Sequence, residues 1–409
     1  MRWVCLALAF GASDGGHPKA LGRDEDHKGA RIGKPAHNMC DEDLERGCWP
    51  RLWLLGAQKS GSCSLFNVME KSLGVCGAEL TGPNAAAAKY FHKETHYWEK
   101  AARQAERGAN ATGDGWDYGD AAHFTRLYPR HIAGLRHCRN GFVEATPNNL
   151  VEARVPALLR GAVPAKFGRR LQFIAVLREP VARDLSAFNH QRHQRVDWLQ
   201  ACPATRFRGY EAFATCQLAI WRSNGANASR VFDALRYGLW AGLYGPQLDA
   251  WSAAFGRKDL LVLESRSMLA NPKATTALVA SFLRVPHGDA QRAKVKAMPV
   301  INAQDDGKKQ RTISCATRDA LGAVFDPYNE ALYAALDDAR RSGRAPDVEP
   351  PFPRFPKFPC EDRGARAAAR PPGLPPPPPP KPPKAKAKPG VRKHKRPAKS
   401  AGKVMIKAG

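Results

Sequence analysis

A short loop after the first apolar run of the chain collects residue types that bind anions. Residues 56–62 read Gly-Ala-Gln-Lys-Ser-Gly-Ser. The glycines allow the backbone to approach a ligand closely, while Lys59 adds a positive charge and the hydroxyls add hydrogen-bond donors. If a helix begins after this loop, its first N–H groups also favour a phosphate. The composition therefore predicts an anion-binding loop.

Two considerations limit what this loop can be. Short Gly/Ser loops open many helices in α/β folds, so an ordinary strand-to-helix turn has the same composition. A Walker A loop requires Gly-Lys-Ser/Thr in that order, whereas here Lys59 precedes Gly61 and no such triplet occurs in the loop. A nucleoside-triphosphate P-loop is therefore disfavoured.

A second group of reactive residues lies in 93–98, which reads Lys-Glu-Thr-His-Tyr-Trp. We expect an extended segment here, and in a strand Glu94 and His96, two residues apart, would share one face. A carboxylate beside an imidazole suits a general base with an orienting group. A strand with a solvated charged face is the structural alternative.

A third group follows the apolar run 171–177. Arg178 comes directly after this run, and Ser186 and His190 follow four residues apart, so they would share one face of a helix. Arg178 and Ser186 could bind a second phosphate through charge-assisted hydrogen bonds. A capped surface helix stabilised by ion pairs is the alternative.

The spacing of apolar residues predicts the elements that position these groups. The predicted strands are 52–55, 171–177 and 259–263. The predicted helices are 62–73 with Ser60 or Ser62 as its cap, one after Pro180, one from Pro272 to Leu283, and one through 321–336. Strands that alternate with helices predict an α/β fold with a central parallel sheet flanked by helices. In such sheets ligands bind at the carboxyl ends of the strands, where the loop and Arg178 both lie.

The chain is long and strongly basic. Its 409 residues suffice for one large or two medium domains, and 43% hydrophobic residues suffice for a core. The formal charge is +26, of which residues 371–409 supply eleven Lys/Arg and no acid, leaving +15 for the rest. Both parts predict polyanionic partners, and nucleic acid and acidic polysaccharide both qualify by charge.

The N-terminus, the sequons and the cysteines indicate the secretory pathway. Residues 1–13 combine one arginine, an apolar run and small residues, as in a signal peptide, and no apolar run reaches the ~18 residues needed to span a bilayer. Sequons at Asn110 and Asn227 fit a lumenal glycoprotein. Ten cysteines without a CxxC pair argue against zinc, so no metal site is expected, and they leave disulfides possible.

These features predict four parts of the chain. Residues 1–13 are the signal peptide, 14–50 a polar linker that Cys40 and Cys48 could tie down, and 51–345 the folded domain. Residues 346–409 are a disordered tail rich in proline and lysine. The tail could tether the protein to polyanions, although a solvated tail without a defined partner is the simpler alternative.

Five segments taken together resemble the heparan sulfate sulfotransferases. In chain order they are the loop 56–61, the run 93–98, Glu-Ala-Thr-Pro at 144–147, Leu-Arg-Glu-Pro at 177–180 with Arg183 and Ser186, and Gly-Lys-Lys at 307–309. Residues 186–192 are most similar to the sulfotransferase half of the glucosaminyl N-deacetylase/N-sulfotransferases, and the chain is also similar to the heparan sulfate 3-O-sulfotransferases. The resemblance covers 51–336.

The resemblance implies a P-loop-like sulfotransferase fold that uses 3′-phosphoadenosine 5′-phosphosulfate (PAPS) and acts on a heparan-sulfate-like glycosaminoglycan, in the Golgi lumen. It implies three catalytic residues: Lys59 neutralises the leaving group, Glu94 takes the proton from an acceptor hydroxyl or amine, and His190 lines the acceptor side. The cofactor-binding residues that it implies are Gln58, Lys59, Ser60, Gly61, Ser62, Cys63, Arg178, Ser186, Lys308 and Lys309.

The chain departs from this family at two points, and two other functions stay open. Ala145 stands where the family usually carries a lysine, and no cysteine lies between Phe282 and Gly307 to close the disulfide-bounded loop of the relatives. A non-catalytic polyanion-binding protein on the same fold is the main alternative. A nucleic-acid binder is less favoured, because no nucleic-acid motif occurs. Lys59 and Glu94 together favour the enzyme, since a binder needs no leaving-group cation paired with a base.

Overall fold

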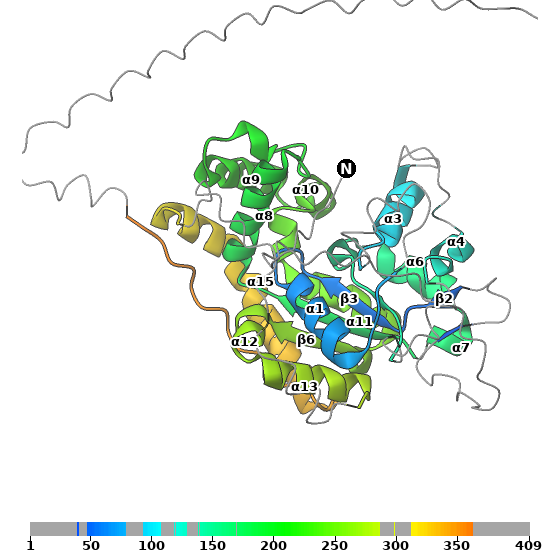
Figure 1. Ribbon diagram of the computed structural model, residues 1–409. Coiled ribbons are helices and arrows are strands. Elements are labelled where there is room, and N and C mark those ends of the chain that lie inside the picture. Colours follow the sequence, from blue (N-terminus) through cyan, green and yellow to red (C-terminus); the bar gives the residue numbers. More distant parts are fainter. Residues whose placement is uncertain are drawn as a thin grey trace, which may run out of the picture. The chain divides into compact units, whose positions relative to one another are not determined.

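The computed structural model describes residues 39–40, 47–78, 93–107, 118, 120–128, 138, 140–168, 170–286, 298 and 312–362 (Figure 1). The predicted signal peptide, Asn110, Lys308, Lys309 and the chain beyond 362 lie outside this described part. The chain divides into two units, Met1–Asp362 and Arg363–Gly409, and all described residues belong to the first.

Four parallel strands form the central sheet. They lie in the order β4 (Val143–Glu144), β3 (Leu52–Gly56), β5 (Gln172–Leu177) and β6 (Leu260–Glu264). The three longer strands confirm the predicted apolar runs, whereas β4 is too short for periodicity to reveal. Because β3 and β5 are neighbours, their carboxyl ends bring the predicted loop and Arg178 to the same edge of the sheet.

The strands are apolar throughout because both faces of the sheet are covered. Along β3, Trp53 and Leu55 face one core cluster, while Leu52 and Leu54 face the other. The first cluster contains side chains of α3 (Tyr97–Arg107), α6 (Val155–Ala162) and α11 (Tyr244–Phe255), and the second those of α1 (Ser62–Leu73), α12 (Ser265–Ala270) and α13 (Pro272–Leu283). This arrangement confirms the predicted α/β class.

A third core cluster is built from helices that do not cover the sheet. It joins α8 (Pro180–Gln194), α9 (Tyr210–Asn224), α10 (Ala228–Leu235) and the front half of α15 (Cys315–Arg341), and Figure 1 shows α8, α9 and α10 grouped together. The remaining described helices are α4 (Ala121–Thr125), α7 (Ala165–Gly168) and the short turns η4 (Pro147–Asn149), η5 (Ala204–Arg206), η6 (Leu239–Gly242) and η7 (Arg257–Asp259). The predicted helices after residues 61, 179 and 271, and the last one, are confirmed by α1, α8, α13 and α15.

Two local predictions are wrong. The N-cap of α1 is Gly61 rather than a serine. Residues 93–96 form no strand, and a turn leads directly into α3. The reason is the burial of Tyr97, Trp98 and Ala101 in the first core cluster, a spacing that suits one face of a helix and not of a strand.

Packing begins before the predicted start of the folded domain. β1 (Met39–Cys40) and β2 (Cys48–Trp49) pair antiparallel and are joined by a Cys40–Cys48 disulfide. The side chains of Met39 and Trp49 lie in the first core cluster. These residues of the predicted linker therefore belong to the fold.

Packing also continues past the predicted start of the tail. Residues 346–362, which we call the strap, follow α15, and Phe352 and Phe355 pack against the first core cluster. Glu349 Oε2 accepts a 2.9 Å hydrogen bond from the backbone N of Val262, and a disulfide joins Cys360 to Cys315. The tail boundary predicted at 346 is therefore wrong, because these anchors hold the strap to the fold.

Two further disulfides join Cys76 to Cys138 and Cys202 to Cys216. Within the described ranges, no helix is both long enough and apolar enough to cross a membrane.

Candidate active site

The predicted anion-binding loop lies between β3 and α1, at the carboxyl edge of the sheet. Gly56 has a φ of 134° and Gly61 a φ of 98°. A Cβ on Gly56 would overlap the carbonyl oxygen of Pro147, so glycine is required there. Gly61 has no side chain that could cap α1, and the positive end of the helix therefore faces the loop. This is the arrangement that an anion-binding loop requires.

Arg178 is fixed against this loop. Its Nη1 donates a 3.0 Å hydrogen bond to the carbonyl oxygen of Lys59, whose φ is 68°. The carbonyl oxygen of Arg178 accepts a 2.7 Å hydrogen bond from Tyr244 Oη. Burial lowers the pKa of Arg178, but a guanidinium keeps its charge at neutral pH. Two cationic residues, Lys59 and Arg178, therefore meet where β3 and β5 end.

The other predicted cofactor-binding residues lie in separate parts of the chain. Gln58, Ser60, Ser62 and Cys63 lie in the loop and the first turn of α1, and both serines are buried. Ser186 is half-buried on α8, one turn before His190. Lys308 and Lys309 lie outside the described residues. The sequence prediction for these two lysines is thus untested.

The end of β4 holds the segment 93–96 in place. Three hydrogen bonds join the two segments: Ala145 N to Lys93 O (2.8 Å), Thr95 Oγ1 to Glu144 Oε2 (2.7 Å) and His96 N to Thr146 Oγ1 (3.0 Å). Glu144 is buried, and burial raises its pKa. The Glu-Ala-Thr sequence therefore positions the segment that carries Glu94.

Glu94 is buried between two cationic side chains. Lys93 Nζ donates to its Oε1, and His96 Nε2 lies 3.3 Å from its Oε2. Burial would raise the pKa of Glu94, but the charges of Lys93 and His96 outweigh burial and lower the pKa to about 2. The carboxylate is therefore ionised at neutral pH.

His96 bridges two carboxylates. Its Nδ1 lies 3.3 Å from Glu99 Oε1, while its Nε2 faces Glu94. Burial would lower the pKa of His96, but Glu99 and Glu94 raise it to about 9. Glu94 and His96 thus meet as the sequence suggested, through a turn with a φ of 53° at His96 instead of a shared strand face.

His190 completes the group of predicted catalytic residues. It is buried on α8, and burial, followed by the charge of Lys59, lowers its pKa to about 3, while the charge of Glu94 opposes this shift. Interactions of this kind weaken with distance. The charges of Lys59 and Glu94 thus both act on the buried imidazole of His190, which is neutral at pH 7.

Sequence reasoning missed one residue of this cluster and included one that lies in the core. Glu99 contacts His96 at a spacing of i, i+3, which a helix predicted from residue 97 would have indicated. Arg183 belongs to the resembling motif, yet it is fully buried and bonds Asp184 Oδ1 at 2.9 Å and the carbonyl oxygen of Gly238 at 2.5 Å. Arg183 is therefore structural.

Comparison with known proteins finds matches among solved structures. No family model matches the chain, and no curated protein matches it. A solved structure of a sulfotransferase from Alicyclobacillus acidocaldarius is similar, with a TM-score of 0.48 and 20% identity over 71% of this chain and 96% of that one. The sulfotransferase domain of the Synechococcus PCC 7002 olefin synthase is similar with a TM-score of 0.35 and 12% identity over 72% of this chain and 97% of that one.

Proposed function

We propose that this protein is a sulfotransferase that moves a sulfuryl group from PAPS to a hydroxyl or amine of a heparan-sulfate-like polysaccharide. One observation supports the proposal: the charges of Lys59 and Glu94 both act on the buried imidazole of His190, and Lys59 lies in the loop that precedes the N-terminus of α1. A cation for the leaving group and an ionised carboxylate for the incoming group are the two parts that such a transfer needs.

The residues of the loop fit the donor. The open N-terminus of α1, Lys59 and the guanidinium of Arg178 suit the negative charges of a phosphosulfate. Bound PAPS would supply a sulfuryl group whose bond to the 5′-phosphate breaks as the acceptor oxygen or nitrogen attacks sulfur. Lys59 would neutralise charge on the bridging oxygen. Ser186 with Arg178 would bind the 3′-phosphate, and Lys308 and Lys309 would cover the donor.

The acceptor would bind on the side of the site opposite the donor. Glu94 would accept the proton that the acceptor hydroxyl or amine loses. His190, held neutral beside Lys59, would line the acceptor side and hydrogen-bond the sugar without adding charge. The excess of Lys and Arg over acids in the chain suits a polyanionic chain as the acceptor.

Four disulfides among the described residues support an oxidising compartment, and we place the protein in the secretory pathway, in the Golgi lumen. The sequon at Asn227, the N-cap residue of α10, would be accessible to a lumenal glycosyltransferase at this exposed helix start.

Transfer of a labelled donor tests the proposal. The purified protein is incubated with PAPS carrying radioactive sulfur and with N-desulfated, O-desulfated and fully desulfated heparin, and label on the polysaccharide is counted. We expect transfer by the wild type and a loss of about 10²-fold or more in Lys59→Ala, because a preorganised cation at a leaving group is worth that much.

Lys71→Ala is the matched control, since Lys71 is exposed at the far end of α1 and should have no effect. Tight binding of all polysaccharides with transfer to none would favour the non-catalytic polyanion-binding protein. Equal turnover in Lys59→Ala and wild type would remove Lys59 from the mechanism.

A further inference from the structure

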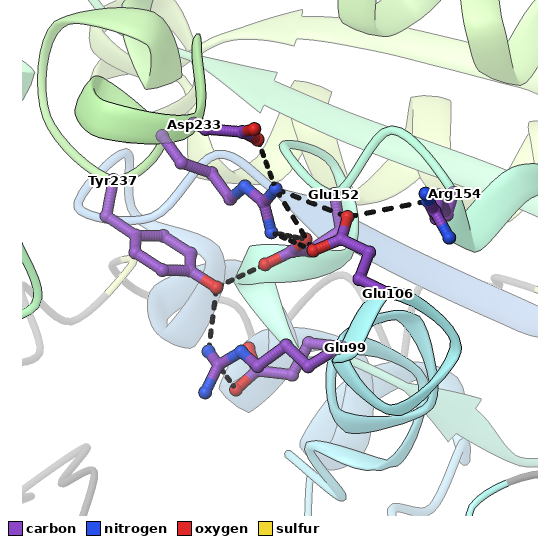
Figure 2. Close-up of polar contacts among 8 residues, drawn as sticks. Glu99, Glu106, Glu152, Arg154, Asp233 and Tyr237 are labelled. Atoms are coloured by element: carbon purple, nitrogen blue, oxygen red, sulfur yellow. Dashed lines mark hydrogen bonds and ion pairs between the residues drawn. The ribbon is translucent and has the colours of Figure 1, made fainter. Parts of the chain in front are cut away.

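A chain of side-chain contacts continues beyond His96, away from Glu94. Glu99 Oε1, which faces His96, also lies 3.4 Å from Nη2 of Arg103, one turn further along α3. The same Nη2 donates a 2.7 Å hydrogen bond to Tyr237 Oη. Tyr237 Oη donates in turn to Glu152 Oε1 (Figure 2). Tyr237 is therefore joined to the proposed base through Arg103, Glu99 and His96.

The far end of this chain is anchored by Arg236. Its guanidinium contacts Glu152 Oε2 at 2.9 Å, Glu106 Oε1 at 3.3 Å and Asp233 Oδ1 at 2.8 Å, and Figure 2 shows these three carboxylates converging from different elements. Glu106 lies on α3, Glu152 precedes α6 and Asp233 lies on α10. The network thus ties the far end of the chain of contacts to α10.

The direction of each hydrogen bond around Tyr237 is determined by charge. Burial raises the pKa of Tyr237 well above its ordinary value, so its phenol keeps the proton that it donates to Glu152. A guanidinium can only donate, so Tyr237 Oη is the acceptor for Arg103. Removing this hydroxyl would leave Arg103 one acceptor short and Glu152 one donor short.

Tyr237 also contacts the opposite half of the site. With Ala57 and Gln58 of the anion-binding loop it lines a small pocket behind that loop. Its carbonyl oxygen accepts a 3.4 Å hydrogen bond from Nη1 of Arg183, which lies on the helix that carries His190. Tyr237 is thus placed where the loop, α8 and the contacts that lead to Glu94 come together.

We infer that Tyr237 is a positioning residue for the proposed base, holding Glu94 in its reactive orientation through Arg103, Glu99 and His96. This inference rests on the proposed function. Without the hydroxyl, Arg103 is free to turn away from Glu99, and the ion pairs that orient His96 and Glu94 lose their outer support. A displacement of about 1 Å at a reacting group can reduce a rate about 10²-fold.

Kinetics of Tyr237→Phe test the inference. We expect kcat to fall about 10- to 100-fold while the dissociation constant for the donor, measured by calorimetry, changes less than about twofold. Tyr333→Phe is the matched control: it removes a hydroxyl that accepts a 2.9 Å hydrogen bond from the backbone N of Phe355 in the strap. The control should lose stability without losing turnover.

A double mutant separates positioning from general stability. Because Tyr237 acts only through Glu94, we expect Tyr237→Phe to reduce turnover no further when Glu94→Gln is already present. Multiplied losses in the double mutant would overturn the inference. If Tyr237→Phe fails to fold, Arg103→Gln takes its place, because it breaks the same chain of contacts at another point. We then expect the same fall in kcat.

A measurement without turnover distinguishes failure of the inference from failure of the proposed function. The ring-nitrogen NMR signals of His96, assigned by their loss in His96→Gln, should shift in Tyr237→Phe and stay unchanged in Tyr333→Phe. Unchanged His96 signals in Tyr237→Phe would overturn the inference even in an active enzyme. Absence of sulfate transfer by the wild type would reject the proposed function, while the His96 signals would still decide whether Tyr237 controls this cluster.

Discussion

At the scale of single residues, the ionised state of Glu94 sets a requirement on the proposed reaction. A carboxylate with a pKa of about 2 is ionised, but it holds a proton weakly. An acceptor hydroxyl that displaced Lys93 from Glu94 would remove one of the two stabilising cations and raise the proton affinity of the base. Entry of the acceptor would therefore make Glu94 a stronger base. Until then Glu94 would take protons only weakly, including those of water.

Replacing Glu94 by Gln tests this assignment. The amide keeps the size of the side chain but cannot take a proton, so we expect turnover to fall about 10²- to 10⁴-fold. Donor binding should persist, because the proposed donor site consists of the loop and Arg178 and does not include Glu94. Calorimetry with the desulfated donor nucleotide and a radiolabel assay give the two values. Parallel loss of both would place Glu94 on the donor side and make His190 the next candidate for the base.

The protonated state of His96 predicts a pH dependence of stability. Its pKa is about 9 in the folded protein, against about 6.5 in an unfolded chain. The folded state therefore binds this proton more tightly, and the stabilisation is complete below about pH 6.5 and is lost as the pH rises from about 6.5 to 9. Urea denaturation across this range should show a falling free energy of unfolding in wild type and a flatter profile in His96→Gln. The same slope in both proteins would show that His96 is not the group responsible.

At the scale of elements, the turn after β3 depends on one backbone position. Gly56→Ala would place a Cβ against the carbonyl oxygen of Pro147, at a φ of 134° that disfavours any side chain. We expect a loss of about 2 kcal/mol or more in the free energy of unfolding. Thermal or urea denaturation measures this loss.

Gly161→Ala provides the comparison for that variant. Gly161 lies in α6 and a Cβ there would meet nothing within 4 Å, so the change should be neutral or stabilise by up to about 1 kcal/mol. Similar effects of the two substitutions would mean that Gly56 is not sterically restricted in solution.

At the scale of the whole molecule, the strap is the last packed segment of the described residues. Deleting 363–409 should leave the melting temperature and the turnover of short acceptors unchanged, because none of the anchors of the strap is lost. Binding to long polyanions at low salt should weaken, since exposed charges act within about a Debye length and are screened by salt. Heparin chromatography at rising salt concentration gives the comparison.

Deleting 346–409, with Cys315→Ser to avoid a free thiol, is the matched variant. It removes Glu349 from Val262 and Arg257 and also removes the Cys315–Cys360 disulfide. Loss of such a disulfide typically costs about 2–5 kcal/mol. Equal melting temperatures for the two deletions would show that the strap does not stabilise the fold.

The sequence by itself determined the parts of the site whose cause is local. The apolar run 52–55 followed by glycines and a helical pattern predicts strand, loop and helix, and β3 and α1 confirm it. The run before Arg178 predicts β5 in the same way. These predictions succeed because burial on both faces of a strand, and the helical spacing after it, depend on residues that lie close together in the sequence. The sequence also led to Lys59, Glu94 and His190 through resemblance.

Only the tertiary structure decided how these parts meet. Thr95 bonds Glu144, 49 residues away, and Arg103 bonds Tyr237, 134 residues away. Such contacts depend on the order of strands in the sheet and on the paths of the connections, which periodicity does not encode. The charge states follow from the same contacts: against the effect of burial, Lys93 and His96 lower the pKa of Glu94 to about 2, and Glu99 and Glu94 raise the pKa of His96 to about 9.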